Sequence, residues 1–432
     1  MKKPSFLIAA PHSGSGKTTI TLGLLRAFNN RGMKVQPFKC GPDYLDPWHH
    51  RNAAGKHSVN LDLFMADEAH VKSQFSKGMQ TADVGLAEGV MGLFDGAHKA
   101  EGSSAEIAKL LNLPVILVVD ARSTAYSVAP LLYGYKYFDP AVNLVGVIFN
   151  FVNSESHCRF LNAACKDVDV PCLGYLPQKE NLKMNSRHLG LSICEKDKSY
   201  DKLLNEIASH VEKHIDLNRL IKACSREVDP CPTVQVQTKG KLKIAVARDE
   251  AFNFYYTNNL EQLETLGTVT FFSPLRDACL PEARLVYLGG GYPELYLEEL
   301  SANPTMLESI RSYCDRGGAL VAECGGMMFL GRSITDKKGK AFPMVGFLNI
   351  RASIEPMKLT LGYRKFRLNN REYRGHEFHY STLTANNEPS LAGKTFNATG
   401  HEVDAPVFRK KNVLASYIHF YWQNDGLIRE VV

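Results

Sequence analysis

Short apolar runs alternate with amphipathic stretches along the first half of the chain. The apolar runs have the length of buried strands, while the stretches between them repeat their apolar positions with a helical period. This alternation predicts a parallel sheet covered by helices on both faces. The expected strands are residues 6–10, 35–38, 84–87, 114–119 and 144–149, and the expected first helix is 18–29.

A second series of the same kind begins after an interruption. Turn formers and helix breakers fill the stretch 226–240, which includes Asp-Pro-Cys-Pro at 229–232, and we interpret it as a linker. The sequence therefore predicts an α/β protein with two doubly wound domains, over residues 1–225 and 241–432. The expected elements of the second domain are strands 242–247, 269–272 and 285–288 and a helix over 255–266.

Composition and charge exclude several classes of protein. Of the 432 residues, 44% are apolar and 22% are charged, which is typical of a soluble globular chain. The net charge of +6 comes from dispersed residues without a basic run, so nucleic acid is not an expected partner. No apolar run approaches the roughly eighteen residues of a membrane helix, and the run near the start is too short for a signal peptide. We therefore expect a cytoplasmic protein that does not enter a membrane.

A phosphate-binding loop follows the first expected strand. The sequence of residues 10–19 is APHSGSGKTT, a glycine-rich turn that leads into a helix through Lys17 and Thr18. Glycines let backbone N–H groups close around phosphate oxygens, the lysine neutralises the phosphates, and the threonine hydroxyl can bind Mg²⁺. Pro11 stands where the usual pattern has its first glycine, so this loop is a variant. The segment predicts a nucleoside triphosphate site.

Two acidic clusters lie just beyond later strands, at the sheet edge where open α/β sheets bind ligands. One is FKCGPDYLDP over 38–47 and the other is EGVMGLFDG over 88–96. Carboxylates beside a triphosphate repel it unless a cation lies between them, which favours Mg²⁺ binding by some of them. A structural turn residue is the alternative for any single acid. The four acids are Asp43, Asp46, Glu88 and Asp95.

The second domain contains a candidate nucleophile, Cys324, in a tight turn between an apolar strand and a helix. Small neighbours let the chain turn sharply and project the thiol, and the start of a helix is expected to lower the thiol pKa. A lone cysteine is more often a core residue. Here, however, the glycine-rich segment 289–294 offers backbone donors for an oxyanion, and His419 offers a base. His376 and His379 could also serve as bases, as metal ligands or as a polar binding wall.

These motifs together closely resemble the cobyrinic acid a,c-diamide synthase family, over essentially the whole chain. Several motifs that occur in the same order as in the family are specific evidence for this resemblance. The phosphate loop alone would indicate only a broad NTPase superfamily. The matching strings are APHSGSGKTT, FKCGPDYLDP, NLDLF from residue 60, EGVMGLFDG, RHLGL from 187, GGGYPE from 289, AECGG from 322 and RGHEFHYS from 374.

The resemblance implies an N-terminal P-loop NTPase domain similar to dethiobiotin synthetase and a C-terminal class I glutamine amidotransferase domain. In that family, ATP phosphorylates the a and c acetate carboxylates of a corrinoid, and ammonia released from glutamine converts each acyl phosphate to an amide. The expected partners are therefore ATP, L-glutamine and a corrinoid or related tetrapyrrole polycarboxylate, with Mg²⁺ as cofactor. A homodimer is left open.

The resemblance also implies roles for residues of the first domain. The ATP phosphates are expected at the loop residues, which are Gly14, Ser15, Gly16, Lys17, Thr18 and Thr19. Asn150 looks like the adenine-contacting asparagine of related synthetases. Substrate binding is expected at Asp43, Tyr44 and Leu45, catalysis at Asp46, Glu88 and Asp95, and Mg²⁺ at Thr18, Asp43 and Glu88.

In the second domain, the resemblance makes Cys324 the glutaminase nucleophile and His419 its base. The oxyanion donors it implies are Gly290, Gly291 and Gly325. Tyr421 stands two residues after the base, where many class I amidotransferases have a glutamate. We therefore expect a Cys-His dyad.

Alternatives concern the substrate and the class of activity. The same reaction could act on hydrogenobyrinate or nickel-sirohydrochlorin, because these present similar acetate arms. Cobyric acid synthase, which amidates other corrinoid side chains, fits the FKCGPDYLDP and RGHEFHYS strings less well. A regulatory or metal-delivery P-loop NTPase with a degenerate amidotransferase module is a remoter alternative, against which the intact Cys324 turn and His419 argue.

Overall fold

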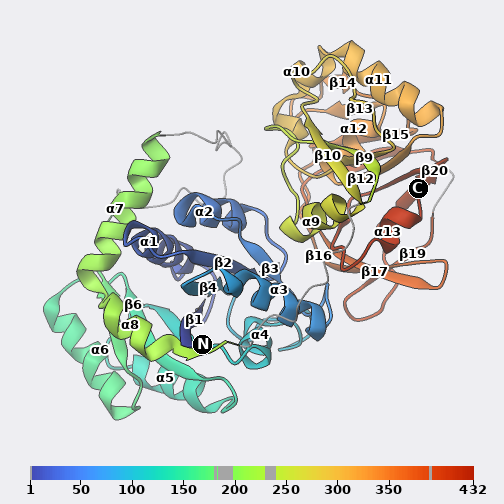
Figure 1. Cartoon of the computed structure of the whole chain (residues 1–432). Coiled ribbons are helices and arrows are strands. Elements are labelled where there is room, and N and C mark those ends of the chain that lie inside the picture. The colour runs from blue at the N-terminus through green and yellow to red at the C-terminus, as the bar shows by residue number, and fades with distance from the viewer. Residues whose placement is uncertain (1, 180–181, 183–197, 229–239, 389–391) are drawn as a thin grey trace. The chain divides into compact units, whose positions relative to one another are not determined.

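The computed structural model of the chain describes residues 2–179, 182, 198–228, 240–388 and 392–432. These residues form two compact units, one before residue 229 and one after residue 239 (Figure 1). The predicted linker 226–240 differs from the structure at its start, because β8 (Ser225–Glu227) pairs with the first strand of the N-terminal unit. Residues 229–239 and the motif at 187–191 lie outside the described residues.

The N-terminal unit is built on a mainly parallel sheet with the strand order β3-β2-β4-β1-β5-β6-β7. The sequence predicted these strands apart from β3 and β7, which occupy the two edges. The α/β fold expected for this half is therefore confirmed. The bounds are β1 (Lys2–Ala9), β2 (Val35–Cys40), β3 (Val59–Leu61), β4 (Val84–Glu88), β5 (Val115–Asp120), β6 (Leu144–Asn150) and β7 (Cys172–Leu176).

Helices cover both faces of this sheet. On one face α1 packs against α2 and α7, and Gly23 lets α1 and α7 approach closely, since a Cβ there would lie 2.5 Å from a Val211 methyl. Beneath α1, Phe6 and Ile8 are fully buried, and each such side chain stabilises the fold by roughly 1.5–3 kcal/mol. The bounds are α1 (Lys17–Asn30), α2 (Leu45–Ala54), α3 (Glu68–Gln80), α4 (Ser104–Leu110), α5 (Val128–Tyr137), α6 (Glu155–Asp167), α7 (Lys198–His214) and α8 (Leu217–Cys224).

The C-terminal unit has a sheet of order β10-β9-β11-β12-β21-β20, in which the last strand alone is antiparallel. The sequence predicted the first strands of this series. The bounds are β9 (Leu242–Ala247), β10 (Gly267–Phe272), β11 (Leu285–Leu288), β12 (Ala319–Glu323), β20 (Val407–Lys410) and β21 (Val413–Ser416). The helices are α9 (Thr257–Leu266), η2 (Pro293–Leu295), α10 (Leu297–Ser301), α11 (Pro304–Asp315), α12 (Gly325–Leu330) and α13 (Gly426–Arg429).

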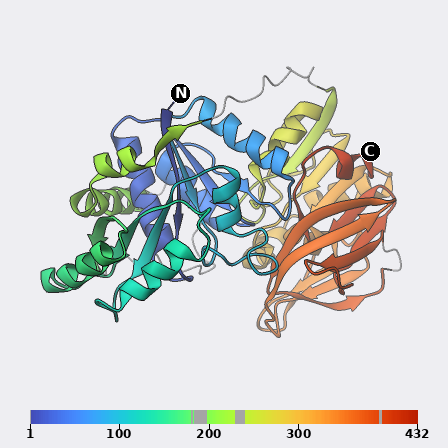
Figure 2. The same ribbon diagram turned by 90° about the horizontal axis from the view of Figure 1, so that it is seen from below.

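Two small sheets, one mixed and one antiparallel, complete the C-terminal unit, and the sequence did not predict them. The order of one is β14-β13-β15-β18 and that of the other is β19-β16-β17-β22, and β16 and β17 form its long hairpin (orange in Figure 2). The bounds are β13 (Ser333–Thr335), β14 (Ala341–Pro343), β15 (Ile350–Ser353), β16 (Thr360–Leu368), β17 (Arg371–His379), β18 (Thr382–Asn386), β19 (Lys394–Asn397) and β22 (His419–Phe420).

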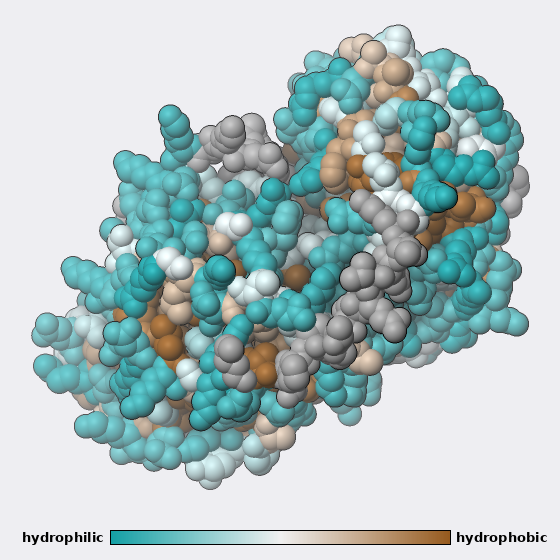
Figure 3. All heavy atoms as spheres, in the orientation of Figure 1, coloured by the Kyte–Doolittle hydropathy of each residue, from teal (hydrophilic) through white to brown (hydrophobic). Residues whose placement is uncertain are grey.

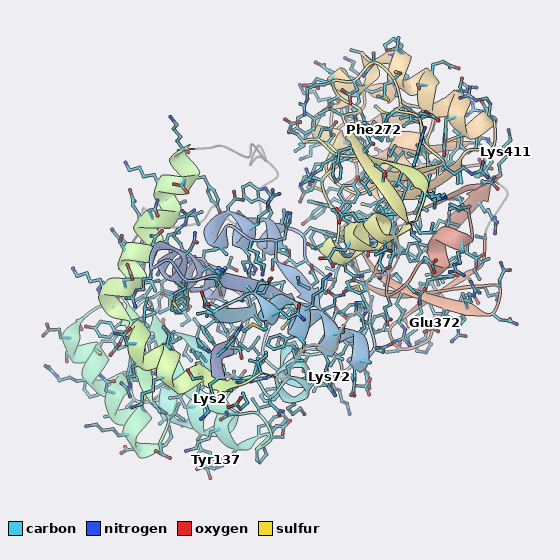
Figure 4. The ribbon with its side chains drawn as sticks, in the orientation of Figure 1. Lys2, Lys72, Tyr137, Phe272, Glu372 and Lys411 are labelled. Carbon is cyan, nitrogen blue, oxygen red and sulfur yellow. The ribbon has the colours of Figure 1, made fainter. Side chains whose placement is uncertain are left out.

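Polar residues cover most of the face of the molecule drawn in Figure 3. Some aromatic side chains are exposed at the end of α5, where Tyr137 lies at the surface (Figure 4) and Phe138 follows it. Within the described ranges, no helix combines the length and the apolar character needed to cross a bilayer.

Candidate active sites

The phosphate loop joins β1 to α1 and has the backbone that its glycines permit. Gly14 and Gly16 have φ values of +83° and +87°, in the left-handed region that favours glycine. A Cβ on Gly16 would lie 2.0 Å from Asn150 Nδ2, so no other residue fits without displacing that amide. The same Nδ2 donates to the Ser15 carbonyl oxygen at 3.0 Å. Asn150 therefore holds the loop from β6, and its adenine contact stays a prediction.

Lys17 begins α1 and reaches the turn that follows β4. Its Nζ donates to the Met91 carbonyl oxygen at 2.6 Å. Burial lowers the pKa of Lys17 to about 8, with the charge of Glu88 opposing that shift. A phosphate group in the loop would compensate the charge of this lysine. Thr19, one residue beyond Thr18, is partly buried at the start of the same helix.

Glu88 is the last residue of β4, and side chains from three other elements contact its carboxylate. Thr18 Oγ1 donates to its Oε1 at 2.6 Å, and His50 Nε2 lies 2.7 Å from its Oε2. Lys39 Nζ is 3.4 Å from Oε1. Burial would raise the pKa of this carboxyl, but Lys39 and the His50 hydrogen bond together hold it below its usual value. Glu88 is thus a buried carboxylate at the loop.

Lys39, the penultimate residue of β2, is a buried cation between two carboxylates. It forms a close ion pair with Asp46 on α2, in addition to its contact with Glu88. Although burial opposes the charge of Lys39, its two anionic neighbours raise its pKa above the usual value. For Asp46, burial is likewise outweighed by Lys39, so the pKa of that carboxyl is lowered. Asp46 is therefore ionised and fixed beside the loop.

The other predicted acids have local tasks in the backbone. Asp43 Oδ1 accepts the N–H groups of Leu45 and Asp46 at 2.9 and 3.2 Å, which caps the start of α2. Tyr44 is the residue immediately before that helix. Asp95 Oδ2 accepts the Gly92 N–H at 2.8 Å and shapes the turn after β4. The site thus combines carboxylates aimed at the loop with carboxylates that order its surroundings.

The donors present suit Mg²⁺ at Thr18 and Glu88 better than at Asp43. A hydroxyl and a carboxylate oxygen already meet at 2.6 Å in the first pair, whereas Oδ1 of Asp43 is committed to backbone donors. In the described ranges, no cluster of three or more His, Cys, Asp or Glu side chains is arranged to hold a metal ion. Mg²⁺ bound with a nucleotide commonly needs only one or two protein ligands beside phosphate oxygens and water.

Sequence reasoning did not assign Lys39 and His50 to this site. Lys39 was the stronger signal, because a charged residue in an otherwise buried strand needs a partner of opposite charge. His50 lies one helical turn after Asp46, on the same side of α2, and this spacing could have drawn attention to it. Both residues contact Glu88 and are fully buried, or nearly so.

Cys324 connects β12 to α12 with a strained backbone. Its φ and ψ are +48° and −107°, which is unusual for a residue that carries a side chain. Its N–H donates to the Ser416 carbonyl oxygen at 2.7 Å, and the Gly326 N–H donates to the Gly289 carbonyl oxygen at 3.1 Å. The turn is therefore fixed from both neighbouring strands.

The thiol of Cys324 is buried, and burial raises its pKa, with the nearby negative charge of Glu294 acting in the same direction. The sequence-based expectation of a lowered pKa is wrong for this structure. The reason is that α12 (Gly325–Leu330) is short. The stabilisation that its dipole gives to the thiolate is therefore smaller than the cost of removing the thiolate from water.

His419 lies on β22 beside the glycine-rich turn. A Cβ on Gly290 would be 2.3 Å from His419 Cε1, so only glycine leaves room for the imidazole. A Cβ on Gly325 would lie 3.3 Å from the Gly291 nitrogen. The fold therefore brings together the predicted base and the predicted oxyanion donors, one of which, Gly325, directly follows Cys324. Burial lowers the pKa of His419 well below its usual value, which keeps the ring neutral.

The first six residues of the motif RGHEFHYS lie on β17, and the motif forms a polar wall of the thiol site. His376 stacks on His419, and its Nδ1 lies 2.8 Å from the Tyr256 hydroxyl. His379 stacks on Tyr417 with ring centroids 3.8 Å apart. Of the roles left open for the two histidines, a polar wall fits these contacts best. Tyr421 packs edge-on against Tyr256, with ring centroids 5.1 Å apart.

Comparison with known proteins gives a family for each unit. Residues 6–191 match the CobQ/CobB/MinD/ParA nucleotide binding domain, and residues 243–427 match the CobB/CobQ-like glutamine amidotransferase domain. The chain is also 40% identical to the cobyrinate a,c-diamide synthase of Caldanaerobacter subterraneus subsp. tengcongensis, with 98% of this chain and 97% of the relative covered. The chain belongs to the cobyrinate a,c-diamide synthase family.

Other members of the cobyrinate a,c-diamide synthase family match the chain over a similar extent. The enzyme of Picrophilus torridus is 38% identical, with 100% of this chain and 98% of the relative covered. That of Archaeoglobus fulgidus is 37% identical, with 99% and 96% covered. The family resemblance inferred from the motifs is therefore confirmed. A nucleotide-binding domain followed by a glutamine amidotransferase domain is the composition of a glutamine-dependent amide ligase.

Proposed function

We propose that the protein converts the a and c acetate carboxylates of cobyrinate to amides, with ATP as the source of energy and glutamine as the source of ammonia. The observation that supports this most strongly is the pairing of two sites within one family member. One unit carries a phosphate loop with the buried carboxylate of Glu88 and the partly buried carboxylate of Asp46, and the other carries Cys324 and His419 beside glycine-rich backbone. Each site suits one half of the reaction.

In the glutaminase half, Cys324 Sγ attacks the carboxamide carbon of glutamine. The thiol proton passes to His419 and then to the departing nitrogen, so that a C–S bond replaces the C–N bond and ammonia leaves. N–H groups of Gly290, Gly291 and Gly325 stabilise the oxyanion. Water then hydrolyses the γ-glutamyl thioester, which releases glutamate and restores the thiol. His419 is kept neutral by burial and can accept the proton.

In the synthetase half, an acetate carboxylate oxygen attacks the γ-phosphorus of ATP, and ADP leaves. Ammonia then attacks the carbonyl carbon of the acyl phosphate, loses a proton, and phosphate departs as the amide forms. The loop residues Gly14 to Thr19 hold the ATP phosphates, and Lys17 neutralises charge on them. Mg²⁺, held by Thr18 and Glu88, would neutralise further phosphate charge. Asp43, Tyr44, Leu45 and Asp95 border the substrate carboxylate, and Asn150 contacts adenine.

The decisive experiment is mass spectrometry of reactions that contain Mg-ATP and glutamine with one tetrapyrrole each. Cobyrinate, hydrogenobyrinate and nickel-sirohydrochlorin are tested separately. Two successive amide-forming mass shifts on cobyrinate, dependent on both ATP and glutamine, are expected. Shifts on another substrate would replace cobyrinate in the proposal. ATP hydrolysis without any amide product would favour the regulatory NTPase. Homodimer formation and a cytoplasmic location stay predictions, for light scattering and cell fractionation to test.

Cys324→Ala separates the two halves. This variant is expected to lose amidation with glutamine but to retain amidation with an ammonium salt, because the synthetase site needs only free ammonia. Loss of both activities in a folded protein would argue against two semi-independent reactions. Glutamine hydrolysis that survives in Cys324→Ser while His419→Ala abolishes it would contradict the assignment of the nucleophile.

A further inference from the structure

Carboxylates surround the Cys324 thiol, and most of them have partners. Glu323, the preceding residue, accepts a hydrogen bond from the Tyr287 hydroxyl at 2.8 Å. Glu377 on β17 forms a close ion pair with Arg364. The charge of Glu377 opposes ionisation of the Cys324 thiol, whereas burial raises the pKa of Glu323 to about 8, so that this carboxyl is largely protonated near pH 7. Each is satisfied within the fold.

Glu294 also acts on the thiol, and more strongly, but lacks such a partner. Among the residues that the structure describes, none forms an ion pair with its carboxylate, and only its own backbone N–H bonds to it. The exposed Lys337 influences it from a distance. Burial raises the pKa of Glu294 to about 7. A desolvated carboxylate without a cation is costly, so a ligand that supplies one would be bound well.

The position of Glu294 places this carboxylate within the thiol site. It lies on η2, directly after the glycine-rich turn that borders His419. A Cβ on Gly325 would lie 2.8 Å from Pro293 Cδ, so the residue before Glu294 packs against the residue after Cys324. Tyr292 in turn packs edge-on against Phe254, with ring centroids 5.0 Å apart. The segment is therefore fixed in place around the thiol.

We infer that Glu294 binds the α-ammonium group of glutamine and is the residue that makes the thiol site specific for an α-amino acid amide. This inference rests on the proposed glutaminase function. Glutamine carries its ammonium group a few bonds from the carboxamide carbon that the thiol attacks. It therefore supplies the missing cation on the same molecule as the electrophile.

Substrate binding through Glu294 also prepares the nucleophile. In the free protein the charge of Glu294 opposes ionisation of Cys324. An ammonium group paired with this carboxylate cancels much of that charge, and the thiol proton is then transferred to His419 more readily. The thiol is thus activated when an amino acid amide is present, and it is protected from other electrophiles when the site is empty.

The test compares two amides in wild-type protein and in Glu294→Gln. L-Glutamine has the α-ammonium group, and glutaramate lacks only that group. Ammonia release is measured for each. Glu294→Gln is expected to lower kcat/KM for glutamine by about 30-fold, because the ammonium group of the substrate loses its counter-ion. For glutaramate, kcat/KM is expected not to fall and to rise if it changes, because no contact with it is lost and the charge that opposes ionisation of Cys324 is removed.

Two further variants complete the design. Glu294→Asp retains the charge and is expected to keep the preference for glutamine over glutaramate. Glu299→Gln removes an exposed carboxylate of the neighbouring helix α10, and kcat/KM is expected to stay unchanged for both substrates. An equal fall for both amides in Glu294→Gln would overturn the inference in favour of a structural role. No fall for either would show that the ammonium binds elsewhere. Wild-type protein that releases no ammonia from glutamine would contradict the proposed glutaminase function instead.

Discussion

The imidazole of His376 stacks on that of His419, with ring centroids 5.1 Å apart and planes 20° from parallel. The two residues are cross-strand partners on β17 and β22. Burial lowers the pKa of His376 to about 3, and burial also lowers the pKa of His419. Two stacked and buried imidazoles repel each other when charged, so both are neutral near pH 7. A neutral ring is the form that the proposed role of His419 as a general base requires.

This stack predicts that acid destabilises the C-terminal unit. The pKa of His376 is about 3 in the folded chain against an ordinary value of 6.5, so the unfolded chain binds a proton first as the pH falls. The contribution of the neutral His376 ring to the free energy of unfolding is complete above pH 6.5 and is lost as the pH falls towards 3. His376→Phe, which retains an aromatic ring, should reduce the dependence of unfolding free energy on pH by about 1.4 kcal/mol per pH unit between pH 6 and 4.

The measurement is urea unfolding followed by the fluorescence of Trp422. Trp48 lies in the other unit, so both proteins carry Trp48→Phe to isolate the signal. His376 is faced by Tyr256 and His419, and the charge of Arg364 also lowers its pKa. These groups are unchanged in the comparison. Identical pH slopes for the two proteins would contradict the prediction, whatever the variant's stability at pH 7.

Gly290→Ala is expected to abolish glutamine use without affecting the synthetase reaction. A Cβ at this position would lie 2.3 Å from His419 Cε1, so the imidazole must move. A misplaced base is expected to lower kcat/KM for glutamine hydrolysis by about 100-fold or more. Amidation with ammonium salts should stay at the wild-type level, since it bypasses the thiol site.

Gly134→Ala is the matched control for this substitution. Gly134 lies within α5, a Cβ there meets nothing within 4 Å, and its backbone accepts any residue. Both activities should therefore be retained. If Gly290→Ala hydrolyses glutamine as fast as wild-type protein, His419 is not the base or it moves without consequence.

Lys39→Met is expected to destabilise the N-terminal unit strongly. The substitution leaves the buried carboxylate of Glu88 and the partly buried carboxylate of Asp46 without their shared cation. Removing one partner of a buried ion pair costs about 3–5 kcal/mol. Lys243→Met is the control, because its ion pair with Glu282 is exposed and such pairs contribute at most about 1 kcal/mol. Urea unfolding followed by Trp48 fluorescence in a Trp422→Phe background measures the first variant, and Trp422 fluorescence in the Trp48→Phe background measures the control.

Periodicity predicted most of the parallel strands of both units, though not β3, β7 and β21, because most of the predicted strands are buried on two faces and form continuous apolar runs. Strands β9 and β11 were predicted with the bounds that the structure has. The hairpin β16–β17 was missed because its strands are half-exposed and rich in charged residues. Glu372 (labelled in Figure 4) is an example, and Arg374 donates a hydrogen bond to it. Its only strong signal was the RGHEFHYS string, which we used as a motif and not as a strand.

Motifs predicted residues of both sites but not the way in which those residues are stabilised. The phosphate loop and the Cys324 turn depend on local backbone chemistry, which glycine and small residues reveal in the sequence. Charges and burial that distant segments of the chain supply determine the roles of Lys39, His50 and Glu294. The pKa of Cys324 was misjudged for the same reason, because the sequence shows a helix start but not how completely the thiol is removed from water.

Lys17→Ala should abolish ATP-dependent amidation with either nitrogen source while leaving glutamine hydrolysis intact. Lys17 is the cation of the phosphate loop and lies within the same cluster as Glu88 and Asp46. Loss of one positioned donor to a transferring phosphoryl group lowers kcat by about 100- to 1,000-fold. Amide formation from cobyrinate with ammonium salts reports the synthetase reaction, and ammonia release from glutamine reports the thiol site. Lys72→Ala, an exposed lysine on α3 (Figure 4), should change neither activity. ATP-dependent amidation that persists in Lys17→Ala would show that the phosphates bind elsewhere.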